Sequence, residues 1–476
     1  KNDSTGVAVT SDLKITFNEI VNVNTGNIVI KNISGTPHET IAITSGQVTG
    51  GGTNTITINP SINFNSKTKY YVEITSGALR DASNNNYAGI TGSGTWAFTT
   101  ADILAPTVTL SSVAPANVNG PFTVSIAFSE KIQNFDINDI SADNGTKSSF
   151  TTVQTDSIFT VQIEPVLNGV VSVQVTTGVC QDMAGNLNTA SNIITKTFDN
   201  IKPTIAITSN KTSPLNGAFT ATFTFSESVI GFDNTDIIVL NGNKSGFAGS
   251  GTSYSVIVTP IANGAVTVDV AADAASDVAG NTSTAADQFS VIYDGTPPTL
   301  AITSVTPNPT NNTALEVKYE FSERVTGFAF SDITVTNGVK VSCTTTDSIT
   351  FNAQITANAN SSVTISCIVD AAKDMAGNNN VAPTALVVKH DNISPTVSIT
   401  STFSPGPVVV SPFEIEITFS EKVVDFDYSD LIISNGIASN LTTSDSIYFT
   451  VDINPSAVGL VTVDINASAA NDLAGN

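Results

Sequence analysis

The sequence predicts an all-β chain made of five consecutive β-sandwich domains. Three observations carry this prediction: a set of motifs recurs about every 97 residues, short runs alternate strictly between apolar and polar residues, and no window shows the period of an amphipathic helix. A chain of 476 residues is also too long for one ordinary hydrophobic core.

The repeat is defined by motifs in a fixed order. Phe-Ser-Glu is followed at seven residues from its Phe by a second Phe, four further on by an Asp, and later by Asp-x-Ala-Gly-Asn; Asp-x-x-x-Pro-Thr separates the repeats. The copies of Phe-Ser-Glu are Phe128–Glu130, Phe225–Glu227, Phe321–Glu323 and Phe419–Glu421, at spacings of 97, 96 and 98. This period exceeds the roughly 20–50 residues of a solenoid repeat and matches a whole β-sandwich domain.

Local patterning predicts strands of the same kind in each repeat. The runs Phe122–Phe128, Leu315–Phe321, Phe413–Phe419 and Val461–Ile465 alternate apolar and polar residues, as half-buried strands do. Turn signals such as Asn144-Gly145 separate about seven such runs in each repeat. The recurring Phe residues fall at core positions of this pattern, so we expect them to pack inside rather than to bind sugars.

The motifs set the expected domain boundaries. We predict a divergent domain over 1–101, repeats over 102–198, 199–293 and 294–390, and a last repeat over 391–476 that lacks its final strand. The first domain has Phe17-Asn18-Glu19 in place of Phe-Ser-Glu, and this Phe comes so early that we expect the opening strand to be missing. Both ends are therefore expected to be cut inside a domain of a longer protein.

The charge balance excludes several classes of partner. With 18 Lys and Arg against 41 Asp and Glu, the net charge is −23, which argues against nucleic acid and anionic membranes as partners.

No run of apolar residues is long enough to insert into a membrane. Catalysis is not expected, because His38 and His390 fall in different domains and no phosphate loop or zinc spacing is present.

Repeats two to five resemble the bacterial Ig-like domains found in tandem in very large surface adhesins. The resemblance rests on Phe-Ser-Glu, on pairs such as Phe232–Ile237, and on Asp-x-Ala-Gly-Asn. The first domain is similar to an Ig-like module of S-layer and polysaccharide-associated proteins. The resemblance implies tandem Ig-like sandwiches in an extended rod at the bacterial cell surface, and some such proteins are mobile adhesins of gliding bacteria.

Strand order in a sandwich brings acidic residues of each repeat to one pole. The linker Asp, the Glu of Phe-Ser-Glu, the Asp after the second Phe, and the Asp and Asn of Asp-x-Ala-Gly-Asn all lie at the end where the chain enters. Clustered carboxylates repel unless a cation neutralises them, and Ca²⁺ prefers such oxygen ligands. The predicted ligands are Asp102, Glu130, Asp139, Asp182, Asn186, Asp199, Glu227, Asp236, Asp277, Asn281, Asp294, Glu323, Asp332, Asp374, Asn378, Asp391, Glu421, Asp430, Asp472 and Asn476.

The same residues also suit ordinary turn chemistry, in which Asp and Asn side chains cap backbone N–H groups. Asp139 and its equivalents in particular are candidates for capping a strand only. A single copy of the pattern would favour capping, whereas convergence in four repeats favours structural Ca²⁺.

Two cysteines of the fourth domain replace apolar residues of the sister repeats. Cys343 and Cys367 should both point inward, where they form either a disulfide across the core or two buried thiols. Cys180 has no partner nearby.

Asp-Ser-apolar tripeptides occupy one turn in several domains. They resemble the O-glycosylation acceptor of the Gram-negative phylum that contains gliding bacteria, and the alternative is a plain Asx turn. The candidate acceptors are Ser4, Ser157, Ser348 and Ser446.

We therefore expect a stalk or adhesive segment, stiffened by Ca²⁺ where domains join. Its partners would be a surface, glycan or protein ligand and the neighbouring domains of the same chain. The alternatives are an S-layer or cell-wall lattice component and the accessory domains of a carbohydrate-active enzyme.

Overall fold

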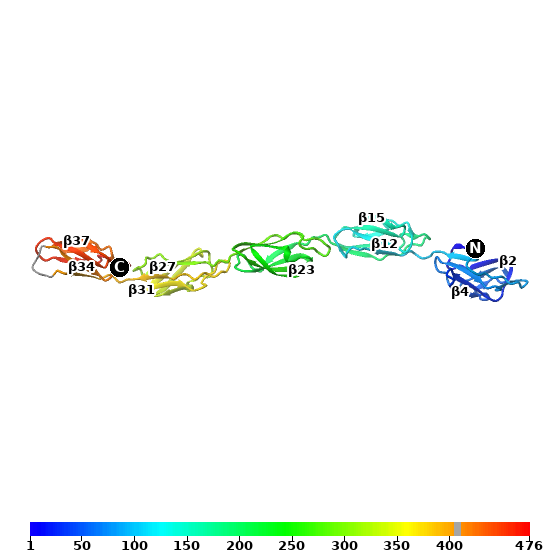
Figure 1. Cartoon of the computed structure of the whole chain (residues 1–476), viewed down its shortest axis with the longest axis horizontal. Coiled ribbons are helices and arrows are strands. Elements are labelled where there is room, and N and C mark those ends of the chain that lie inside the picture. Colours follow the sequence, from blue (N-terminus) through cyan, green and yellow to red (C-terminus); the bar gives the residue numbers. More distant parts are fainter. Residues whose placement is uncertain (404–410) are drawn as a thin grey trace. The chain divides into compact units, whose positions relative to one another are not determined.

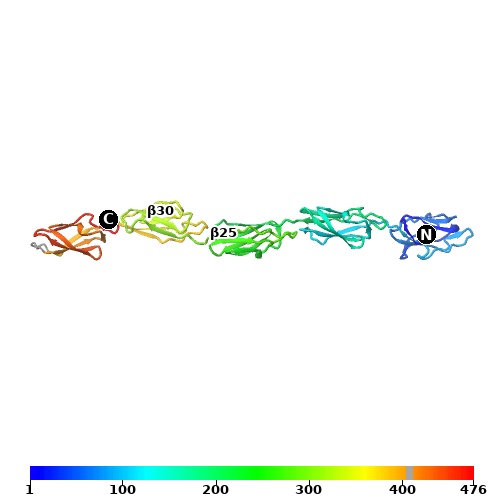
Figure 2. The same cartoon turned by 90° about the horizontal axis from the view of Figure 1, so that it is seen from above.

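The computed structural model describes residues 1–403 and 411–476. In both views each of five successive stretches of the chain folds into a two-layer β-sandwich (Figures 1 and 2). Within the described residues the helical segments are four 3₁₀ turns, each of three residues. The contacts group residues 1–203 and 275–283 into one compact unit and residues 204–274 and 284–476 into a second.

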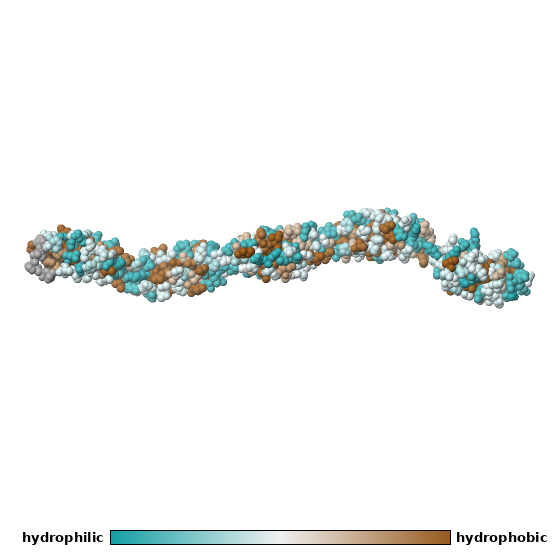
Figure 3. Space-filling model, in the orientation of Figure 1, coloured by the Kyte–Doolittle hydropathy of each residue, from teal (hydrophilic) through white to brown (hydrophobic). Residues whose placement is uncertain are grey.

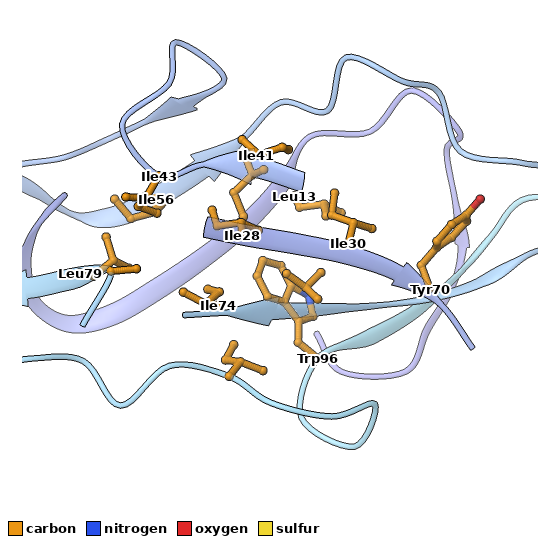
Figure 4. Packing of buried hydrophobic residues seen from close by; sticks show 14 of the residues in the cluster. Leu13, Ile28, Ile30, Ile41, Ile43, Ile56, Tyr70, Ile74, Leu79 and Trp96 are labelled. Atoms are coloured by element: carbon orange, nitrogen blue, oxygen red, sulfur yellow. The ribbon is translucent and has the colours of Figure 1, made fainter. Parts of the chain in front are cut away.

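The first domain has one five-stranded sheet, β1-β9-β7-β3-β4, and one four-stranded sheet, β5-β6-β2-β8. Its strands are β1 (Ser4–Val7), β2 (Leu13–Val23), β3 (Asn27–Asn32), β4 (Pro37–Ala42), β5 (Val48–Thr49), β6 (Thr53–Ile58), β7 (Lys69–Ile74), β8 (Leu79–Asp81) and β9 (Ala97–Thr100). Figure 4 shows Trp96 among Ile28, Ile30 and Ile74 in the core between these sheets.

The domain begins with one short strand, β1, that the sequence did not predict. Strand β1 pairs in parallel with β9 at the edge of the larger sheet. The sequence did not reveal β1 because Ser4–Val7 has no apolar alternation of its own, and backbone pairing leaves no mark on side-chain pattern.

The second domain shows the plan of the repeats. Its sheets are β10-β12-β16-β15 and β11-β19-β17-β14, with a small β13-β18 pair at one end. The elements are β10 (Val108–Ser111), β11 (Asn117–Val118), β12 (Phe122–Phe128), β13 (Ile132–Gln133), η1 (Ile137–Asp139), β14 (Ile140–Asp143), β15 (Gly145–Gln154), β16 (Ile158–Pro165), β17 (Gly169–Val175), β18 (Gln181–Asp182) and β19 (Ile194–Phe198).

The remaining repeats keep this plan. The third contains β20 (Ile205–Ser209), β21 (Phe219–Val229), η2 (Asn234–Asp236), β22 (Ile237–Leu240), β23 (Gly242–Pro260), β24 (Gly264–Val270) and β25 (Phe289–Tyr293). The fourth contains β26 (Leu300–Ser304), β27 (Ala314–Phe321), η3 (Phe330–Asp332), β28 (Ile333–Thr336), β29 (Gly338–Thr345), β30 (Thr350–Ala357), β31 (Ser361–Cys367) and β32 (Leu386–His390). The fifth contains β33 (Val397–Ser401), β34 (Phe413–Phe419), β35 (Val423–Val424), η4 (Tyr428–Asp430), β36 (Leu431–Ser434), β37 (Gly436–Thr443), β38 (Tyr448–Pro455), β39 (Thr462–Ile465) and β40 (Asn471–Asp472).

The alternating runs form strands with the predicted faces. In β12, the large apolar residues Phe122, Val124, Ile126 and Phe128 are buried, and each residue between them is less so. The recurring Phe residues pack in the cores: Phe128 and Phe135 meet edge to face with ring centres 5.0 Å apart. This confirms their expected core role.

The Asn-Gly turns do not close hairpins. Asn144, at φ 56°, joins β14 of one sheet to β15 of the other, and its side chain donates to the carbonyls of Leu167 and Val170. Asn tolerates this left-handed conformation better than most residues, so it suits a crossing between sheets.

Candidate functional site: carboxylate clusters at the domain entrances

Three carboxylates meet where the chain enters the second, fourth and fifth domains. In the second domain they belong to the linker residue Asp102, to Glu130 just after β12, and to Asp182 at the end of β18, and oxygen atoms of all three lie within 4.8 Å of one another. We call this group the Asp102 triad. The Asp294 triad (Asp294, Glu323, Asp374) and the Asp391 triad (Asp391, Glu421, Asp472) repeat the arrangement.

The buried member of each triad holds its own turn together. Asp182 is 1% exposed, and its Oδ1 accepts the backbone N–H groups of Ala184 and Asn186 at 2.8 and 2.9 Å. Asn186 Nδ2 donates to Asp182 Oδ2 at 2.8 Å and to the carbonyl of Asp102 at 3.1 Å. Although burial alone would raise the pKa of Asp182, these hydrogen bonds lower it.

The Asn side chain of the motif therefore holds the linker to the turn by hydrogen bonds. Its amide nitrogen, rather than its oxygen, faces the triad carboxylate and the linker carbonyl. The same two bonds are made by Asn378 and Asn476 in the second unit, and by Asn281, which donates to Asp277 and to the carbonyl of Asp199 in the first unit. Glu227 lies within β21 of the second unit.

The linker Asp also caps backbone. Asp294 Oδ1 accepts the N–H of Thr296 at 3.0 Å, and Asp102, Asp199 and Asp391 do the same two residues on. Turn capping, the alternative to cation binding, is thus present in these residues. The Glu of each triad is the carboxylate least involved in hydrogen bonds to the backbone.

Asp139 and its equivalents each cap a short 3₁₀ turn. Asp139 Oδ2 accepts the N–H of Asp136 at 2.7 Å and so closes a capping box on η1. Asp236 and Asp430 close the same box on η2 and η4, whereas on η3 Asp332 makes only its half, by accepting the N–H of Ala329. None of the four belongs to a triad. Capping is the alternative that the sequence left open for these four residues, and cation binding by them stays a prediction.

The triads differ in the charge beside them. In the first unit, Lys67 Nζ lies 2.7 Å from Asp102 Oδ2 and 3.2 Å from Glu130 Oε2. Hydrogen bonds to these two carboxylates raise the pKa of Lys67, and the bond from Lys67 lowers that of Asp102. Lys389 pairs with Asp391 at 3.1 Å.

The Asp294 triad has no such ammonium group among the described residues. Burial, together with repulsion from Asp374 and Asp294, raises the pKa of Glu323. Burial and repulsion from Asp472 and Asp391 likewise raise that of Glu421, although Lys389 acts in the opposite direction. The negative charges of these carboxylates are held close together without enough nearby positive charge to balance them.

Two further motif residues, the Thr of Pro-Thr and the Ser of Phe-Ser-Glu, contact each other at the domain entrance, and the sequence analysis did not predict this. The N–H of Thr299 donates to Ser322 Oγ at 3.0 Å, and the N–H of Ser322 donates to the carbonyl of Thr299 at 3.0 Å. The Pro-Thr of the linker and the Ser of Phe-Ser-Glu thus bind each other in every repeat. The recurrence of both motifs at fixed positions was the signal that could have found this pair.

The cysteine expectation is resolved toward free thiols. Cys343 on β29 and Cys367 on β31 pack against the core from opposite sheets and form no disulfide, and Tyr319 interacts with both. Burial raises the pKa of Cys367 to about 11 and that of the buried Cys180 to about 12, so neither is a reactive thiolate at neutral pH.

The candidate acceptor serines are not fully exposed. Ser157 is 9% exposed, and Ser4, Ser348 and Ser446 are half-buried. Asp347 Oδ1 accepts the N–H groups of Ile349 and Thr350, as an Asx turn does. This geometry favours the plain turn, and sugar attachment stays a prediction.

Solved structures that this chain resembles include several bacterial surface proteins. FdeC, an Escherichia coli adhesin, is 15% identical over 61% of this chain and 98% of its own, with a TM-score of 0.31. Invasin, described as a bacterial integrin-binding protein, is 15% identical over 77% of each chain, with a TM-score of 0.31. The surface layer protein SbsC, domains 1–6, is 15% identical over 97% of this chain and 63% of its own, with a TM-score of 0.21. No curated protein matches the sequence.

Family profiles match nearly the whole chain, and neither of them is catalytic. One bacterial Ig-like domain profile matches residues 102–197, 199–293, 294–388 and 391–476, and a second bacterial Ig-like domain profile matches residues 1–100. Among the described residues, no helix has the length and apolar character needed to span a membrane. The chain belongs to the bacterial Ig-like domain family and consists of such domains in tandem.

Proposed function

We propose that this chain is a spacer segment of a bacterial cell-surface adhesin, in which Ca²⁺ bound at the carboxylate triads stiffens the domain entrances. The observation that carries the proposal is the triad itself: linker, strand end and turn each supply one carboxylate to one place. Among the described residues, no ion pair to a basic side chain involves the Asp294 triad. A stiff spacer would hold a binding tip away from the cell.

The residues suit a hard divalent cation. All three groups are carboxylates, and no His or Cys takes part, which favours Ca²⁺ over zinc or copper. At the Asp294 triad, Glu323, Asp294 and Asp374 would be the protein ligands. A bound cation would remove the repulsion that raises the pKa of Glu323, and it would tie the linker to two loops of the domain that follows.

Thermal unfolding of the full chain with Ca²⁺ and with chelator tests this proposal. A ligand at one hundred times its Kd adds about 2.7 kcal/mol to the free energy of unfolding, so at least one transition should rise clearly in temperature. Small-angle scattering in the same two buffers should show a less flexible chain with Ca²⁺. Identical melting curves and scattering in both buffers would refute the Ca²⁺-stiffened spacer.

Sedimentation of the same samples separates the spacer from a surface lattice. A spacer stays monomeric with Ca²⁺ at micromolar concentration, whereas a lattice component associates laterally. A Glu323→Gln, Glu421→Gln double variant is the matched control, because it keeps side-chain size and removes one ligand charge from each of two triads.

A further inference from the structure

One loop of each repeat makes a contact that the triads do not explain. After the first strand the chain crosses to the other sheet and pairs in parallel with the last strand, at Val118, Leu215 and Thr310 in successive repeats. These residues are 7%, 3% and 3% exposed, so the position is anchored. An exposed Asn follows each of them: Asn119, Asn216 and Asn311.

The Asn meets the turn of the following repeat. Asn311 Nδ2 donates to the carbonyl of Gly475 at 2.6 Å, and its backbone N–H donates to the carbonyl of Ala474 at 3.0 Å. Both acceptors belong to the Asp-x-Ala-Gly-Asn motif of the fifth domain. The bonds therefore recognise the backbone of that turn.

Glycine suits this contact because of its backbone conformation, and the Asn amide packs directly against it. Gly475 has φ +92°, and a Cβ at this residue would lie 3.4 Å from Asn311 Nδ2. A Cβ on Gly377 would lie 3.5 Å from Asn216 Nδ2, and one on Gly280 would lie 3.4 Å from Asn119 Nδ2. In the second domain, by contrast, a Cβ on Gly185 would meet nothing within 4 Å.

The contact closes a ring of hydrogen bonds around the linker. The carbonyl of Thr310 accepts the N–H of Asp391 at 3.0 Å, and the carbonyl of Asp391 accepts Asn476 Nδ2 at 2.7 Å. Asn476 and Gly475 are neighbours in the turn, and Gly475 accepts from Asn311, which is the neighbour of Thr310. The linker is thus held from both sides by partners that also hold each other.

An apolar side chain sits beside the ring. The residue after the motif Asp is Met183, Val278, Met375 or Leu473, with 71%, 66%, 59% and 58% of its surface exposed. In the second unit, Met375 lines a cleft of about 530 Å³ with Pro214 and Leu215, and Leu473 lines one of about 480 Å³ with Pro307 and Pro309. Large exposed apolar residues at one repeated position indicate a contact surface.

We propose that the anchored Asn loop is a docking surface whose partner is the Asp-apolar-Ala-Gly-Asn turn of the next repeat. It couples two consecutive repeats through backbone recognition and without a cation. The second domain's turn is not met in this way, since its linker is held instead by Ser66 and Lys67 of the first domain. The proposal therefore goes beyond the Ca²⁺ function and stands independently of it.

Site-resolved hydrogen exchange of the full chain tests the docking. The backbone N–H of Asn311 is the reporter, because its acceptor lies in the next domain. In the wild-type chain we expect this amide to be protected with Ca²⁺ and equally with chelator. Gly475→Ala should make it exchange about fivefold faster, the effect of losing roughly one hydrogen bond. Gly185→Ala imposes the same strain at φ +93° without an Asn opposite, and it should leave Asn311 unchanged.

The outcomes separate the two proposals. An Asn311 amide that exchanges freely in the wild-type chain, or that is unaffected by Gly475→Ala, overturns the docking. Protection that vanishes in chelator also overturns it, while leaving Ca²⁺ stiffening intact. Protection in both buffers with melting curves that ignore Ca²⁺ upholds the docking and refutes the Ca²⁺ proposal. If Gly475→Ala disturbs folding, Asn311→Ala serves in its place, with faster exchange expected at residue 311.

Discussion

The Asp102 and Asp294 triads have the same three carboxylates but a different source of positive charge. At the Asp102 triad, Lys67 of the preceding domain bridges Asp102 and Glu130. At the Asp294 triad, no ammonium group among the described residues takes this place, and the pKa of Glu323 is raised. The comparison teaches that the entrance geometry is common to the repeats, whereas its electrostatic compensation is set by the neighbouring domain.

We expect the largest loss of stability from substitution of the motif Asp, which binds its own turn in the same way in both triads. Asp374→Ala removes the acceptor for the N–H groups of Gly377 and Asn378, and it should cost about 3 kcal/mol because two half-buried donors lose their partner. Asp182→Ala should cost a similar amount in the second domain. Denaturant unfolding of both variants checks this, and a loss in only one of them would break the equivalence of the two turns.

The capping Asp should give a smaller, cation-independent effect. Asp139→Ala removes half of the capping box on η1 and should cost about 1 kcal/mol. The loss should be the same with Ca²⁺ and with chelator, because Asp139 is not a triad member. A loss seen only with Ca²⁺ would place Asp139 in the ligand set.

Lys67→Met should make the Asp102 triad behave like the Asp294 triad. Lys67 is largely exposed, so its loss should cost at most about 1 kcal/mol in chelator. The measurement is the shift in melting temperature on adding Ca²⁺, which should be greater for Lys67→Met than for the wild-type chain. Lys69→Met is the matched control, since Lys69 pairs with Asp3 away from the triad.

Glu323→Gln should have the smallest effect, and one whose sign depends on Ca²⁺. The folded pKa of Glu323 is raised above its ordinary 4.5, so the favourable contribution is complete below 4.5 and is lost as pH rises through the folded pKa. In chelator at neutral pH the variant should therefore be slightly more stable, by less than about 1 kcal/mol. In Ca²⁺ it should be less stable. Melting curves from pH 4 to 7 in both buffers check the sign.

Sequence pattern predicted the strands well because burial of alternate residues is local information. The run Phe122–Phe128 became β12 with its predicted buried face, and the recurring Phe residues became core. The pattern missed β1, a short edge strand without apolar alternation. It also grouped Asp139 with the triads, since residue type does not distinguish a ligand from a cap when both occur near one pole.

By itself, the sequence determined the all-β class, the repeat and the convergence of Asp102, Glu130 and Asp182, because periodicity and strand order follow from side-chain pattern. Only the tertiary structure decided which groups of the preceding domain contact each domain entrance. Lys67 lies in a loop of the first domain and pairs with the carboxylate of Asp102. Asn311 lies in a loop of the fourth domain and donates to the carbonyl of Gly475 in the fifth. Such contacts depend on how loops project from finished sandwiches, and no local period records that direction.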